Sequence, residues 1–180
     1  WPRVAVTHPH RLLSPSEART AGESQVGGKA WGLARLHDAN ATVPEWTALS
    51  ADACLSALEL GGLGDQLRTT LADLVGVDAT QPEGRATLDA ASQAMRDAVS
   101  TLSVTELLGP ALAADLAGLD PGPWAVRSSM VGEDSESHSF AGQLESYLFQ
   151  GADDIPSAIA KCWGSAFSPH ALLYRLSAGM

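Results

Sequence analysis

The segment Gly27-Gly28-Lys29 has residue types that suit a phosphate group. Glycines at the start of a helix allow a ligand to approach the backbone closely, and the first helical N–H groups favour an anion. Lys29 would add a mobile positive charge. The P-loop pattern is not met, because an extra glycine precedes Lys29 and Ala30 stands where Ser or Thr would hold magnesium. On its own, Gly-Gly-Lys is more typical of a turn with a solvated lysine.

The second candidate group is the guanidinium of Arg127, within the stretch AVRSSMVGEDSESHSFAGQLESYLF that begins at residue 125. An arginine at a strand end, beside hydroxyl groups and small residues, suits a bidentate anion such as a carboxylate or a phosphate. An internal salt bridge is the alternative, and its candidate partners are Glu133, Asp134 and Glu136. The residue types alone leave both interpretations open.

Gly142 lies inside the apolar part of the same stretch. A glycine within a strand indicates a bulge or a place where another backbone or a ligand approaches closely. Packing against a bulky neighbour is the alternative explanation. Gly142 is therefore a candidate contact, although the glycine itself does not identify what would approach it.

The elements that would position these groups can be predicted from the sequence. Residues 25–39 are typical of a glycine turn that opens a helix, and residues 42–50 are expected to form a short strand. Residues 51–118 are rich in Ala and Leu and helical in character, with the clearest helix over 85–102. Further on, a helix is expected over 151–167, with Asp153 or Asp154 as its cap and Pro156 in its first turn.

A pair of strands is expected to carry the arginine and the third glycine. Residues 119–124 give a strong turn signal, residues 124–129 follow as a strand, and residues 139–149 are its expected neighbour. Side chains alternate along a strand. Arg127 should therefore lie on the face opposite to Trp124 and Val126.

Composition excludes several classes of partner. The 180-residue chain has 11 Lys and Arg against 21 Asp and Glu, a formal net charge of −10. It contains no Lys/Arg cluster, which argues against a nucleic-acid partner, and no apolar run near the roughly 20 residues of a membrane span. The five histidines show no metal-ligand spacing, so no metal site is predicted. Cys54 and Cys162 are expected to be reduced thiols of a cytoplasmic protein rather than a disulfide.

Three segments resemble, in the same order, the nucleotide-binding domain of phosphoenolpyruvate synthases, pyruvate phosphate dikinases and rifampicin phosphotransferases. The first is GGKAWGLARL followed by VPEWTALS, the second is AVRSSMVGED with SFAGQLESYLF, and the third is DDIPSAIAKCWGSAFSPHALLYR. The combination is specific and spans most of the chain, whereas residues 51–118 match only as a generic helical insert. Glu45-Trp46, Leu144 and Ser146 depart from the residues that are common in the family, and threonine is common where Ser146 stands.

The resemblance implies an α+β fold in which residues 1–180 form the first part of an ATP-grasp-like domain, with a small sheet packed against several helices. It implies ATP and Mg²⁺ as ligands. By position, Lys29 and Arg127 would contact the ATP phosphates and would be the catalytic residues, and Gly142 would be a close backbone contact. The supporting candidates are Ser128, Ser129 and Gln143.

The family's reaction needs more than this chain. Its enzymes transfer the β-phosphoryl group of ATP to a histidine on a swivelling domain and then to pyruvate or a drug hydroxyl, releasing AMP and phosphate. The sequence contains no second lobe, no histidine motif of the swivelling domain and no acceptor-binding domain, so these are expected on other domains or subunits. The acceptor is open. The alternative function is a non-catalytic binding or regulatory module that keeps the ATP-binding fold.

Overall fold

The computed structural model describes residues 10–130, 134–135, 138–139 and 145–177, and most of them are helical. The α-helices are α1 (Pro15–Ala21), α2 (Glu23–Asp38), α3 (Ala51–Leu60), α4 (Gly64–Asp73), α5 (Pro82–Ser100), α6 (Val104–Leu108), α7 (Pro110–Ala117), α8 (Ile155–Gly164) and α9 (Pro169–Ser177). Two short 3₁₀ helices, η1 (Ala152–Asp154) and η2 (Ser165–Phe167), flank α8. The helical character predicted for residues 51–118 is confirmed by α3 to α7.

Strands β1 (Trp124–Arg127) and β4 (Ser146–Gln150) pair antiparallel, as the sequence predicted for these segments. A second, very short antiparallel pair joins β2 (Asp134–Ser135) to β3 (His138–Ser139). The fold is thus mostly helical with small two-stranded sheets, in agreement with the expected α+β class.

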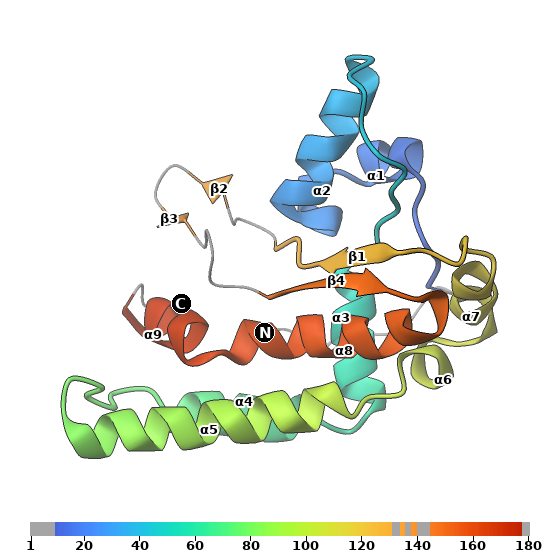
Figure 1. The fold of residues 1–180 in the computed structure, drawn as a ribbon. Coiled ribbons are helices and arrows are strands. Elements are labelled where there is room, and N and C mark those ends of the chain that lie inside the picture. The colour runs from blue at the N-terminus through green and yellow to red at the C-terminus, as the bar shows by residue number, and fades with distance from the viewer. Residues whose placement is uncertain (1–9, 131–133, 136–137, 140–144, 178–180) are drawn as a thin grey trace.

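The elements are arranged in layers around the β1–β4 pair (Figure 1). Helix α8 runs along one side of the pair and contacts both strands, and α5 lies on the far side of α8. Helices α1 and α2 pack against each other on the opposite side of the strands. The pair therefore lies between the α1–α2 unit and a helical layer built largely from residues 51–118.

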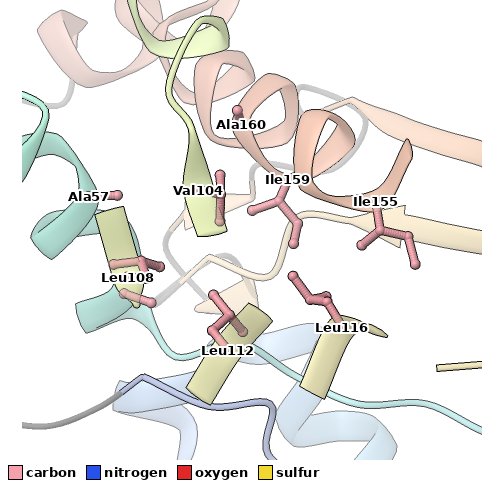
Figure 2. Close-up of a cluster of buried hydrophobic side chains, with 9 residues drawn as sticks. Ala57, Val104, Leu108, Leu112, Leu116, Ile155, Ile159 and Ala160 are labelled. Atoms are coloured by element: carbon pink, nitrogen blue, oxygen red, sulfur yellow. The ribbon is translucent and has the colours of Figure 1, made fainter. Parts of the chain in front are cut away.

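One hydrophobic cluster fixes the strands to α8. Figure 2 shows its side chains converging from α3, α6, α7 and α8: Ala57, Val104, Leu108, Leu112, Leu116, Ile155, Ile159 and Ala160. Trp124 and Val126 of β1 pack against this cluster from the sheet. The predicted alternation is confirmed, because Trp124 and Val126 are partly buried whereas Ala125 and Arg127 are exposed.

A second cluster joins α5 to α9 and to the 3₁₀ turn before α9. It contains Leu58, Leu67, Leu74, Leu88, Met95, Val99, Phe167 and Leu172. The buried hydroxyl of Ser92 donates to the Phe167 carbonyl at 2.7 Å, which satisfies both groups away from water. The predicted apolar face of α5 is confirmed, and Pro82 stands in its first turn, where a missing N–H is tolerated.

Two local predictions are wrong. Residues 42–50 do not form a strand, and only Ala48 makes an isolated bridge, to Leu13. Pro44 has no N–H to donate to a neighbouring strand, and this segment runs instead beside α1 and α2. Asp154 occupies the N-cap position of α8, but its side chain makes no capping hydrogen bond, because η1 already turns the chain into the helix.

The described residues contain no helix that is both long enough and apolar enough to cross a membrane.

Phe149 has an unusual backbone conformation for a large side chain. Its φ is +58°, in the left-handed region, and its side chain is 83% exposed. Trp124 is opposite Gln150 and Val126 is opposite Tyr147, so a bulge in β4 places two residues opposite Ala125. A left-handed phenylalanine costs on the order of 1 kcal/mol or more.

We therefore expect Phe149→Asn to raise the free energy of unfolding by about 1 kcal/mol, because asparagine tolerates the left-handed region far better. Urea denaturation followed by circular dichroism measures the change. Leu148→Asn is the matched control, because Leu148 is also exposed, at 55%, but has no positive φ. An equal gain from both variants would contradict the strain explanation.

Candidate functional site

The Gly-Gly-Lys segment lies inside α2, at a break in the helix. Gly27 has φ +76° and ψ +169°, which is not helical, and the helix restarts directly after it. The predicted glycine turn that opens a helix is therefore present, preceded by a short helical stretch that the sequence did not indicate. Gly27 and Gly28 are buried, and Lys29 is partly buried.

The break is packed directly against the chain that leaves β1. A Cβ built on Gly27 would lie 2.1 Å from the Ser129 carbonyl oxygen and 2.6 Å from its Oγ, so no side chain fits there. The Gly28 N–H donates to the Met130 carbonyl at 3.0 Å. The Ala30 N–H donates to Ser129 Oγ, also at 3.0 Å. These contacts join two segments that are distant in sequence.

The contacts change the expected role of the helix start. The sequence suggested that the first N–H groups would face an anion, but those of Gly28 and Ala30 bond to the end of β1. Ser129, a supporting candidate for ATP contact, has its hydroxyl committed to this junction. The N–H groups of Gly28 and Ala30 are therefore not available to an anion.

Arg127 lies at the end of β1, two residues before the junction, and its side chain is exposed. Its partner across the strand pair is Ser146, the first residue of β4. Among the residues whose side chains the structure describes, no carboxylate forms an ion pair with Arg127. Glu133 and Glu136, two of its alternative partners, lie outside the described residues.

Lys29 approaches the same end of the sheet from α2. Burial raises the pKa of the Cys162 thiol on α8 to about 11, and the Lys29 ammonium acts in the opposite direction. Lys29 is therefore close enough to Cys162 of α8 to act on its thiol, and Cys162 in turn contacts Glu145 directly before β4. Burial also raises the pKa of Cys54, to about 12, so both thiols are protonated at neutral pH. Neither forms a disulfide, as the sequence predicted.

Glu145, immediately before β4, connects three elements. Its carboxylate accepts a hydrogen bond from Arg96 Nη2 of α5 at 2.5 Å and another from the Tyr147 hydroxyl. Its carbonyl oxygen accepts the Cys162 Sγ–H at 3.7 Å. The sequence analysis missed this cluster, because the segment containing Arg96 matched only as a generic insert.

The remaining candidates are placed only in part. Ser128 is partly buried and lies between Arg127 and the junction. Gly142 and Gln143 lie outside the described residues. Ser146 was noted in the sequence only as a departure from threonine. Ser146 is opposite Arg127 in the β1–β4 pair. Its place beside Arg127 follows from the strand register, which the sequence does not reveal.

Gly27 should be the position least tolerant of a side chain. We expect Gly27→Ala to lower the free energy of unfolding by about 3–5 kcal/mol, because it combines a strained φ with overlap against Ser129. Chemical denaturation measures this loss.

Gly22→Ala separates the two causes. Gly22 has φ +82°, but nothing lies within 4 Å of the Cβ that it would gain. Strain alone should cost about 1–2 kcal/mol there. Equal losses from the two alanine variants would show that the contact between Gly27 and Ser129 contributes nothing.

The sequence of this chain matches a known protein family. Residues 23–180 match the family model described as "Pyruvate phosphate dikinase, AMP/ATP-binding domain". The chain is 32% identical over 161 residues to a probable phosphoenolpyruvate synthase of Methanocaldococcus jannaschii, covering 86% of this chain and 13% of that protein.

Two further relatives cover the same share of the chain. A phosphoenolpyruvate synthase of Pseudomonas aeruginosa is 33% identical over 159 residues, covering 86% of this chain and 20% of that protein. A rifampicin phosphotransferase of Bacillus cereus is 31% identical over 157 residues, covering 86% of this chain and 17% of that protein. The chain thus spans between 13% and 20% of the length of these relatives. The resemblance found in the sequence is confirmed, and the chain belongs to the pyruvate phosphate dikinase family of AMP/ATP-binding domains.

Proposed function

We propose that this chain binds the phosphates of ATP where the start of the second part of α2 meets the end of β1. The observation that supports the proposal is the direct contact of Gly27 and Gly28 with Ser129 and Met130. This contact brings Lys29 next to the segment that carries Arg127. A bound anion at this junction would therefore lie near two cations from distant parts of the sequence.

The two cations would have different tasks. Arg127 is exposed on the strand face, and its planar guanidinium would bind two phosphate oxygens at once. Lys29, on the helix, would act as a point charge on another part of the triphosphate. Catalysis of phosphoryl transfer consists mainly of positioning and charge neutralisation, which these two side chains would supply. Ser128 and Ser146 would contribute hydroxyl groups beside Arg127.

Mg²⁺ would arrive as its complex with ATP and would bridge phosphate oxygens. Within the described parts of the chain, no group of three acidic, histidine or cysteine side chains is placed to hold a cation. The carboxylate of Glu145 is engaged by Arg96 and Tyr147. We therefore assign no ligand of Mg²⁺ among the described residues, and Gly142 and Gln143 remain proposed backbone and side-chain contacts to the nucleotide.

At the level of architecture, we propose that residues 1–180 are the first part of an ATP-grasp-like domain. The helices of residues 51–118 would be its helical insert, and they form continuous cores with α8 and α9. In such a domain the nucleotide lies between two lobes. The strand face that carries Arg127 and Ser146 would be the side presented to the second lobe.

For the complete reaction, we propose a dikinase-type phosphotransferase. The phosphoryl group would pass from ATP to a histidine on another domain and then to an acceptor, leaving AMP and phosphate. Relatives with the names phosphoenolpyruvate synthase and rifampicin phosphotransferase match the chain over similar ranges, so they support the class of reaction and not the acceptor.

The alternative is a module that binds ATP without turnover. It is compatible with a chain that spans only 13% to 20% of its relatives' length. Formation of AMP from ATP by the complete gene product distinguishes the two functions. AMP formation that depends on Lys29 and Arg127 supports the phosphotransferase, and binding without AMP formation supports the module.

Isothermal titration with Mg·ATP tests the binding site. We expect Lys29→Ala and Arg127→Ala each to weaken binding by about ten-fold to a hundred-fold, because each removes a charge-assisted contact worth about 1.5–3 kcal/mol. The unfolding midpoint of Arg127→Ala should stay close to that of the wild type, because Arg127 is exposed.

The chain offers a matched control for each variant. Lys161 is exposed on α8, and Arg85 makes an exposed ion pair with Asp89 on α5. Lys161→Ala and Arg85→Ala should leave the Kd of Mg·ATP unchanged. Failure of the wild type to bind Mg·ATP, or equal weakening by all four variants, would overturn the proposed site.

A further inference from the structure

The Arg96–Glu145 contact connects the helical insert to the nucleotide site. Arg96 lies in the C-terminal part of the long helix α5, and its Nη2 is 2.5 Å from Glu145 Oε1. Glu145 directly precedes Ser146, the residue paired with Arg127. The family match and the sequence motifs assign no role to Arg96.

The backbone geometry explains why Arg96 reaches Glu145 across α8. Gly164 of α8 faces α5, and a Cβ built on it would lie 3.4 Å from the Arg96 carbonyl oxygen and 3.8 Å from its Cα. These are van der Waals distances, so the two helix backbones pass close to each other at this point. The close approach allows the arginine side chain to pass α8 and meet the start of β4.

The carboxylate of Glu145 is held on both oxygens. Arg96 bonds to Oε1 and the Tyr147 hydroxyl donates to Oε2. Burial and the neighbouring carboxylate raise the pKa of Tyr147, so it stays protonated and remains a donor at neutral pH. On the backbone side, Cys162 contacts the Glu145 carbonyl. Glu145, the residue directly before β4, is therefore held from α5, from α8 and by Tyr147 of the strand itself.

We propose that Arg96 is a positioning residue for ATP binding: by holding Glu145 it sets the start of β4 and thereby the Arg127–Ser146 pair. This inference rests on the proposed function. It gives the helical insert a task in the site, because α5 supplies the cation that fixes the strand. Arg96 does not itself touch the nucleotide.

The size of the effect is limited by the exposure of the pair. The Arg96 side chain is 33% exposed and that of Glu145 is 41% exposed. Because both side chains are partly exposed, solvent screening limits the strength of the contact to the range of surface ion pairs, and we place it near the upper end of that range. Arg96→Met retains the length and apolar stem of the side chain and removes its charge. It should weaken Mg·ATP binding about five-fold.

The test compares four single variants and one double variant by titration with Mg·ATP and by thermal unfolding. Arg96→Met and Glu145→Gln should each raise the Kd about five-fold, and the double variant should be no worse than either, because both remove the same contact. Arg96→Lys should restore most of the affinity. Arg85→Met, which breaks an exposed ion pair on the same helix, should leave the Kd unchanged.

A purely structural role would give a different pattern. It would lower the unfolding temperature of Arg96→Met without changing the Kd. In the nucleotide-free protein, Arg96→Met should also shift the backbone amide signals of Arg127 and Ser146, whereas Arg85→Met should not. A wild-type Kd in Arg96→Met, or additive losses in the double variant, would overturn the inference while the proposed site stands. Absence of binding by the wild type would remove both.

Discussion

The contact between the helix break at Gly27 and the end of β1 is the constraint on which the rest of the site depends. A side chain at Gly27 would overlap the Ser129 carbonyl. The N–H groups of Gly28 and Ala30 donate hydrogen bonds of 3.0 Å to the segment that follows β1. This junction joins α2 directly to the chain that follows β1, in addition to the contacts of α2 with α3 and of Arg11 with Asp115. The junction brings the part of α2 that carries Lys29 next to the segment that directly follows Arg127.

A sheet of two strands is too small to be stable by itself, so its position is set by helices. Helix α8 supports it from one side through Ile155 and Ile159, and α5 reaches it through Arg96. The helices between residues 51 and 118 are therefore part of the same cores as the family motifs. This arrangement explains how a segment without recognisable motifs can still influence the residues that carry the proposed chemistry.

Much of the local structure could be predicted from periodicity and turn signals. The face of α5 formed by Leu88, Met95 and Val99 was clear, as was the exposed side of β1. The strand predicted over residues 42–50 did not form because, among the described residues, only Leu13 pairs with this segment, through Ala48, and the sequence pattern does not reveal this. Tertiary contacts such as Gly27–Ser129 and Arg96–Glu145 were not predictable, because glycine freedom and an isolated arginine do not identify a distant partner.

The central claim is that Lys29 and Arg127 share one bound triphosphate, and a paramagnetic probe tests it most directly. Mn²⁺ in place of Mg²⁺ broadens the amide signals of residues close to the metal bound to ATP. The account predicts that titration with Mn·ATP broadens the signals of Gly28, Lys29 and Arg127 together, while those of α4 stay sharp. Broadening around only one of the two cations, or centred on α4 and α5, would contradict it.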